Sequence, residues 1–244
     1  MPRNALGLLL ALLATAAPAA AAPTIVSVEF DDGTSDQLQA LPLLARAHLP
    51  ATFFVNSGLI GTSKHLTWTR LRAMQAAGDE IAGHTLHHPR LTTLTEAKAR
   101  HEICADRAAL RAHGFAATDF AYPYGAFDVP LMRIVRGCGY ETGRAISGIL
   151  CPGCPFAEPL PLQRPYATRT PQAVLADTRP TDIHQEVAGA QGHGGGWVQL
   201  VIHHVCARCA RYSITRQDLA ELLTWLRHRH GVVVRTVAQT SSML

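Results

Sequence analysis

The chain has 244 residues, of which 48% are apolar, and a formal net charge of +4. The basic residues are spread without a basic run, which argues against nucleic-acid binding, and the apolar content is ample for one buried core. Beyond the N-terminus no stretch resembles the roughly 20 apolar residues of a membrane span, so we expect none.

Residues 1–21 have the pattern of a secretory signal peptide. Arg3 supplies a positive charge, Ala5 to Ala17 an apolar segment too short for a membrane span, and Ala19-Ala20-Ala21 a cleavage pattern. We therefore expect an exported protein, periplasmic or extracellular, in which residues 22–244 form a single domain.

Strand and helix patterns alternate along the rest of the chain. The expected strands are residues 24–30, 51–55, 80–83, 119–122, 140–146, 197–205 and 232–234. The expected helices are residues 38–44, 68–77, 96–113, 129–136 and 215–230, while residues 147–196, rich in Pro and Gly, are expected to be loops with short elements. This alternation predicts a parallel sheet, open or closed into a barrel.

Polar clusters lie where several of these strands end. They are Asp31-Asp32, His84, Tyr122-Pro123-Tyr124 and His203-His204. Because the carboxyl ends of the strands of a (β/α) barrel converge on one active site, this placement favours an α/β barrel of about seven parallel strands over an open sheet.

His84 and His88 have a spacing that lets two imidazoles reach one metal ion. A metal site needs a third ligand, and a carboxylate from Asp31-Asp32 is the nearest candidate in the pattern. One of these acids can bind the metal while the other handles protons. With 13 histidines in the chain, a chance spacing of this kind is the competing interpretation.

Four motifs, taken together and in order, resemble those of the polysaccharide deacetylase family, carbohydrate esterase family 4 (the NodB-homology domain). They are Phe30-Asp31-Asp32-Gly33, His84-Thr85-x-x-His88-Pro89, Tyr122-Pro123-Tyr124-Gly125 and Leu200-x-x-His203. The resemblance implies a deformed (β/α) barrel and a divalent metal, expected to be Zn²⁺. It also implies the removal of N-acetyl groups from an acetylated carbohydrate polymer or oligosaccharide.

By position, Asp31 resembles the catalytic base, and Asp32, His84 and His88 resemble the metal ligands. His203 matches the acid that protonates the departing sugar amine, and the backbone N–H of Tyr124 the oxyanion donor. Adjacent side chains of a strand point to opposite faces, so only one of His203 and His204 can face the site, and we favour His203.

The third motif departs from the family at one position. The family pattern has an arginine that orients the catalytic aspartate, where this chain has Ala121. A guanidinium from elsewhere could replace it, because its donors form a rigid fork that holds a carboxylate. We expect Arg164 to play this part; an ordinary exposed arginine is the alternative.

The six cysteines are an even number, which suits disulfides in an exported protein. Cys151-Pro-Gly-Cys154 and Cys206-Ala-Arg-Cys209 form a paired set that would indicate a structural zinc site in an intracellular protein. In either case we expect these two loops to pack side by side, which leaves Cys104 to pair with Cys138. The connectivity is open.

Three other functions remain compatible with these residues. They are an esterase acting on O-acetylated xylan, a carbohydrate-binding relative without catalysis, and an exported metal-binding protein. Metal analysis and acetate release from different polymers distinguish them.

Overall fold

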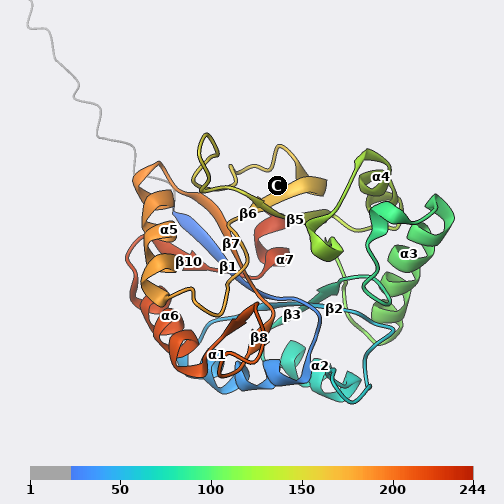
Figure 1. Ribbon diagram of the computed structural model, residues 1–244, viewed down its shortest axis with the longest axis horizontal. Coiled ribbons are helices and arrows are strands. Elements are labelled where there is room, and N and C mark those ends of the chain that lie inside the picture. The colour runs from blue at the N-terminus through green and yellow to red at the C-terminus, as the bar shows by residue number, and fades with distance from the viewer. Residues whose placement is uncertain (1–22, 244) are drawn as a thin grey trace, which may run out of the picture.

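The computed structural model describes residues 23–243, so the expected signal peptide lies outside the described residues. In this range eight parallel strands form one curled sheet, ordered β10-β1-β2-β3-β4-β5-β6 with β7 paired to β1 (Figure 1). The strands are β1 Thr24–Phe30, β2 Thr52–Val55, β3 Glu80–Gly83, β4 Asp119–Ala121, β5 Thr142–Gly148, β6 Thr168–Thr170, β7 Gly196–Ile202 and β10 Val232–Val234. The predicted fold class is confirmed.

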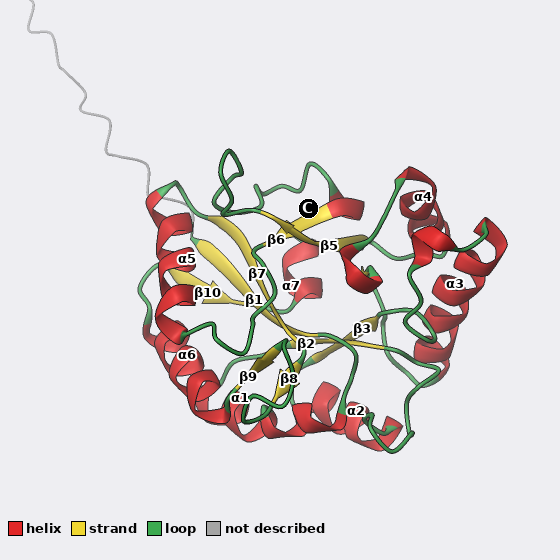
Figure 2. Cartoon of the chain, viewed as in Figure 1, coloured by secondary structure: helices red, strands yellow, loops and turns green. Residues whose placement is uncertain are grey.

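Six of the helices surround this sheet, and Figure 2 shows them at the rim of the view with the strands inside. They are α1 Leu41–Ala47, α2 Trp68–Ala76, α3 Glu96–Ala112, α4 Val129–Gly137, α5 Pro180–Gly192 and α6 Arg216–His228. Each buries an apolar face: α6, for example, buries Leu219, Leu222, Leu223 and Leu226, spaced as one side of a helix. No helix among residues 23–243 has both the length and the apolar character that crossing a membrane requires.

A short last helix, α7 Val237–Ser241, covers the end of the sheet where the strands begin. The amide of Val237 donates to Thr52 Oγ1 at 2.9 Å, and the amide of Ala238 donates to Glu80 Oε2 at 2.8 Å. Thr52 and Glu80 are the first residues of β2 and β3. The opposite end, where the strands finish, is therefore left for the functional side chains.

The barrel is deformed because its two edges are not joined by a strand ladder. Among residues 23–243, β6 pairs only with β5, and β7 pairs only with β1 in this sheet. The gap is bridged by a side chain: Gln199 Nε2 on β7 donates to the carbonyl of Arg169 on β6 at 3.2 Å.

Two expectations about elements need correction. Residues 147–196 contain the full-length helix α5, which buries Ile183, Val187 and Ala190 at helical spacing. The glycines near its C-terminal end made this segment resemble a loop in the sequence. The expected strand 197–205 ends at Ile202. His204–Val205 form a separate short strand, β8, which pairs with β9 Ser213–Ile214. His203 lies at the break between them.

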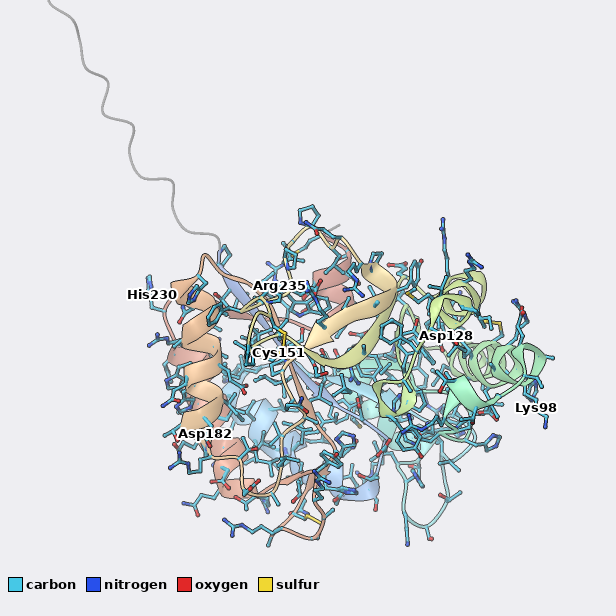
Figure 3. All side chains as sticks on the ribbon, turned by 45° about the horizontal axis from the view of Figure 1, so that its top comes forward. Lys98, Asp128, Cys151, Asp182, His230 and Arg235 are labelled. Atoms are coloured by element: carbon cyan, nitrogen blue, oxygen red, sulfur yellow. A yellow bond between two sulfur atoms is a disulfide. The ribbon has the colours of Figure 1, made fainter. Side chains whose placement is uncertain are left out.

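All six cysteines are paired. Cys104–Cys138 is one bridge, as expected, and it links α3 to the end of α4. Each CxxC segment closes on itself, giving Cys151–Cys154 and Cys206–Cys209. Cys151 is labelled in Figure 3 beside its yellow bond, and Figure 1 shows the loop after β5 well separated from β8. The expectation that the two CxxC loops pack side by side is therefore wrong.

We predict that no free thiol is titrated when the purified exported protein is denatured without a reductant. Three bridges account for all six sulfur atoms, and reduction should release six thiols. The measurement is a thiol titration before and after reduction. Six free thiols in the unreduced protein, together with a second equivalent of zinc, would instead support a structural zinc site.

Candidate active site

The register between β1 and β7 places Asp31 beside His203. Phe30 pairs with Ile202, and the amide of Asp31 donates to the carbonyl of Ile202 at 2.9 Å. The next residue along each of these parallel strands is Asp31 on one and His203 on the other, so both lie at the carboxyl end of the sheet. His203 Nε2 is 3.9 Å from Asp31 Oδ2.

The turn after β3 brings two histidines to Asp32. The amide of His84 donates to the carbonyl of Val55 at 3.1 Å, which keeps His84 in line with the end of β2. The amide of His88 donates to Thr85 Oγ1 at 2.9 Å and closes the turn. As a result, the Nε2 atoms of His84 and His88 lie 3.5 Å and 3.3 Å from Asp32 Oδ1.

These three side chains fit a divalent metal ion. His84 Nδ1 lies 2.8 Å from the carbonyl of Ala121, a contact that in the neutral imidazole places the ring proton on Nδ1 and leaves the lone pair of Nε2 directed at Asp32. Asp32 Oδ1 is buried and accepts no hydrogen bond of good geometry from the described residues. Two imidazoles and a carboxylate form the ligand set of a metal site with open positions for water or substrate.

The ionisation of Asp32 and His88 also suits a cation. Burial works to lower the pKa of His84, but the carboxylates of Asp32 and Asp31 outweigh it and raise that pKa, so metal binding would displace a proton from His84. Burial works to raise the pKa of Asp32, but the contact with His84 and the proximity of His88 outweigh it and hold that pKa well below its ordinary value. Burial, together with the nearby His84, lowers the pKa of His88 to about 4. Near neutral pH, Asp32 is therefore an anion and His88 a neutral imidazole, the forms in which each binds a metal.

Left-handed backbone conformations gather at this site. Asp32, Thr85, His88 and Tyr124 have φ angles of 75°, 73°, 60° and 60°. A non-glycine residue in the left-handed conformation costs on the order of 1–3 kcal/mol of conformational free energy. Such residues are concentrated at active sites and ligand-binding sites.

Arg144, not Arg164, holds Asp31. Arg144 Nη2 donates to Asp31 Oδ1, and Arg144 Nε lies 2.8 Å from Glu29 Oε2, with all three side chains at most 4% exposed. Arg164 is exposed on the segment before β6. The prediction that Arg164 pairs with Asp31 is wrong, because the inward-facing Arg144 of β5 already occupies that position.

Two acids, Glu29 in β1 and Asp31 directly after it, share the single guanidinium of Arg144. Glu29 and Asp31 are two residues apart and share a face of β1, and Arg144 reaches both from β5. Burial raises the pKa of Glu29 to about 8 despite the opposing effect of Arg144, so Glu29 is largely protonated near neutral pH. Burial also works to raise the pKa of Asp31, but Arg144, His84 and His203 outweigh it and keep that pKa below its usual value. The charge of Arg144 is thus matched by Asp31.

The two neighbouring histidines have different environments. His203 lies in a pocket of about 380 Å³ together with Asp31, Asp32, His84 and His88, whereas His204 Nδ1 lies 2.9 Å from Asp36 Oδ2. Burial lowers the pKa of His203, and the carboxylates of Asp31 and Asp32 oppose that effect. Of the two, His203 is the one that faces the candidate site.

Two tyrosines line the mouth of this pocket. Tyr124 is 57% exposed, with its ring 4.7 Å from that of His88, and Tyr212 is 39% exposed, with its ring 5.1 Å from that of His203. Aromatic side chains that are partly exposed at a pocket can pack against the apolar face of a sugar.

Sequence reasoning missed Arg144, Glu29 and Tyr212. A signal existed for the first two, because each is a charged residue inside a segment expected to be a buried strand. A buried charge needs a partner, so these two strands could have been expected to face each other through an ion pair. Nothing comparable distinguishes Tyr212, which follows the CxxC loop.

A scan against family models matches residues 19–143 to the polysaccharide deacetylase family. The chain therefore belongs to this family, and the match contains three of the four motifs above. It includes the pair Asp31-Asp32 and the two histidines His84 and His88.

Curated relatives agree with this assignment. A chitooligosaccharide deacetylase from Rhizobium leguminosarum bv. trifolii is 29% identical over 224 residues, covering 88% of this chain and 90% of that protein. The YxkH protein of Bacillus subtilis (strain 168), named for the same family, is 32% identical over 121 residues. That alignment covers 48% of this chain and only 43% of YxkH.

Solved structures share the fold. A CE4 domain of a multidomain xylanase from the hindgut metagenome of Trinervitermes trinervoides has a TM-score of 0.61 at 19% identity, with 90% of each chain covered. A family 4 carbohydrate esterase from Streptomyces lividans has a TM-score of 0.60 at 20% identity, with 86% of this chain and 91% of that chain covered. These structures support the deformed barrel.

Proposed function

We propose that this chain is a metal-dependent hydrolase that removes N-acetyl groups from a sugar polymer or oligosaccharide outside the cytoplasm. The observation that carries the proposal is the convergence of an arginine-held carboxylate, a three-ligand metal set and a histidine in one pocket. The likeness to a chitooligosaccharide deacetylase along most of the chain supports an N-acetylated substrate. The expected export rests on the sequence of residues 1–21.

Asp32, His84 and His88 would hold the metal, for which zinc suits a ligand set of nitrogen and oxygen. When bound, the metal supplies a Lewis acid that polarises a carbonyl and acidifies water. Asp31, ionised and held by Arg144, would take the proton of the water molecule that attacks the acetyl carbon.

The remaining roles fall to His203 and Tyr124. His203 would donate a proton to the sugar nitrogen as the carbon–nitrogen bond breaks, leaving a free amine and acetate. The backbone N–H of Tyr124 is proposed to donate to the oxygen on which negative charge develops. The side chains of Tyr124 and Tyr212, which both line the pocket, would support the sugar ring.

We predict that His84→Ala and His88→Ala each lose most of the metal affinity and, with it, the activity. Each change removes one of three protein ligands. Metal content after chelation and repletion is measured by elemental analysis, together with acetate release. His87, whose ring contacts Glu102 outside the ligand set, provides the control variant His87→Ala. Full metal content and activity in both ligand variants would contradict the assignment.

We predict that His203→Ala lowers turnover about 10²–10⁴-fold, the usual contribution of a general acid or base. His204→Ala is the matched control, because His204 faces Asp36 instead of Asp31. Steady-state turnover on an N-acetylated oligosaccharide is measured for both variants at equal metal content. Equal losses, or a larger loss in His204→Ala, would refute the role of His203.

The substrate is tested by measuring acetate release from chitooligosaccharide, peptidoglycan, poly-N-acetylglucosamine and acetylxylan. The proposal predicts release from at least one N-acetylated substrate at a higher kcat/KM than from acetylxylan. Preferential release from acetylxylan would make the chain an O-acetyl esterase. Binding of the oligosaccharide without release by metal-loaded protein would indicate a non-catalytic relative.

A further inference from the structure

A second cluster of metal-ligating side chains lies apart from the candidate active site. The sulfur atoms of Cys206 and Cys209 and a carboxylate oxygen of Asp36 all lie within 4.8 Å of one another. Asp36 belongs to η1 Ser35–Gln39, and the two cysteines follow β8. The two sulfur atoms form a disulfide in this structure.

We propose that reduction of the Cys206–Cys209 bridge creates a second metal site, in which Asp36 and the two thiolates bind a zinc-like divalent ion. This proposal goes beyond the deacetylase function and does not rest on it. Thiolates select soft and borderline metals such as Zn²⁺, and three protein ligands leave one position for water.

The backbone of the loop favours this use of the sulfur atoms. The amide of Cys209 donates to Cys206 Sγ at 3.1 Å. A hydrogen bond from an N–H to sulfur stabilises the negative charge of a thiolate, as N–H donors do for other anionic acceptors. The other CxxC segment differs, because the amide of Cys154 donates to the carbonyl oxygen of Cys151 at 2.8 Å. That pair also belongs to no ligand cluster among the described residues.

The third ligand is oriented in advance. His204 Nδ1 lies 2.9 Å from Asp36 Oδ2, and Thr34 Oγ1 donates to Asp36 Oδ1. An oriented carboxylate with such partners resembles a metal ligand supported by outer contacts.

The movement required is small. Zinc–sulfur bonds of about 2.3 Å at a tetrahedral ion separate two thiolates by about 3.7 Å, so the sulfur atoms need to part by only about 2 Å from their bonded distance. Ala207, Arg208 and Cys209 are exposed, which gives a reductant access to the bridge.

The chemistry balances with a dithiol as the reductant. The dithiol gives two electrons and two protons and becomes a disulfide, while the Cys206–Cys209 bond breaks to give two thiols. Metal binding then releases these two protons as the thiolates coordinate.

Cobalt(II) is the probe, because a thiolate–cobalt bond gives a near-ultraviolet charge-transfer band that a site of imidazole and carboxylate lacks. The full mature protein is reduced with a dithiol, freed of reductant under anaerobic conditions and titrated with cobalt(II). We expect a band that saturates at one equivalent of thiolate-bound metal and is absent from the oxidised protein. Because the catalytic ligands contain no sulfur, this result is independent of the proposed deacetylase function.

Variants of the two CxxC segments separate the sites. The double change Cys206→Ser with Cys209→Ser should abolish the band, while Cys151→Ser with Cys154→Ser should retain it. Alkylation of the reduced wild-type protein before cobalt addition should also abolish the band, which covers the case of a variant that fails to fold.

Asp36→Asn removes a ligand and should weaken the affinity for cobalt(II). His204→Gln removes only an outer contact, a change that typically costs roughly 10–100-fold in metal affinity. We expect the loss in Asp36→Asn to be the larger of the two. The proposal would be overturned by an equal band in oxidised protein or by its loss in the Cys151/Cys154 variant. Retention in the Cys206/Cys209 variant, or unchanged affinity in Asp36→Asn, would also overturn it.

Discussion

Asp31→Asn is expected to lower turnover by about 10²–10⁴-fold while the protein keeps its metal. The amide has nearly the shape of the carboxylate but cannot take a proton from water. Asp31 is not among the three converging ligands, so metal binding should persist. Turnover and metal content are measured on the same preparation.

Asp32→Asn is the control for this experiment. It should lose metal affinity, because Asp32 Oδ1 is the atom that the Nε2 atoms of His84 and His88 approach. Loss of metal in Asp31→Asn, with retention in Asp32→Asn, would reverse the roles of the two carboxylates.

Arg144→Met is expected to reduce both stability and turnover. Removing one partner of a buried ion pair leaves an uncompensated charge and typically costs about 3–5 kcal/mol of the free energy of unfolding. Here the stranded group would be Asp31, which is only 3% exposed. Unfolding by denaturant and steady-state kinetics give the two quantities.

Arg144→Lys distinguishes positioning from folding. Lysine keeps the charge but cannot contact Glu29 and Asp31 with a rigid fork, so we expect the free energy of unfolding to recover more than kcat does. Glu29→Gln should retain most activity, because Glu29 is largely protonated near neutral pH. Arg164→Ala is the matched control, since Arg164 is exposed. Normal kcat in Arg144→Lys, or a strong loss in Arg164→Ala, would contradict the assignment.

Much of the candidate site could be predicted from local sequence because its ligands follow strand ends. Asp32 is the second residue after β1 and His84 the first after β3, and in parallel strands these ends meet at one edge. The placement of His203 also follows from pairing, since Phe30 aligns with Ile202. The expected strand was too long, but the error lay beyond His203 and did not change which histidine faces Asp31.

The partner of Asp31 could not be found by the same reasoning. Arg144 lies in β5, which is separated from β1 in the sheet by β2, β3 and β4. The contact exists because the sheet curls until these strands face each other, and curvature is not encoded in any short motif. Arg164 has a suitable local pattern but lies on the segment before β6, away from the interior.

The helix α5 was missed for a local reason. The segment has helix signals, namely Pro180 at the first position and the apolar residues Ile183, Val187 and Ala190. Its glycines, Gly189, Gly192 and those that follow, are instead typical of a loop. Burial against the sheet decides in favour of the helix, since Ile183, Val187 and Ala190 are at most 1% exposed.

The most direct test of a metal site that works with Asp31 is a titration of turnover against bound metal. Protein freed of metal by a chelator, with its metal content verified by elemental analysis, is supplied with zinc in fractions of one equivalent. Acetate released from an N-acetylated oligosaccharide is measured at each step. We expect no turnover without metal, a linear rise of turnover with bound zinc, and a plateau at one equivalent. In Asp31→Asn the turnover at the plateau should be lower by about 10²–10⁴-fold. Full turnover by verified metal-free protein would contradict the account.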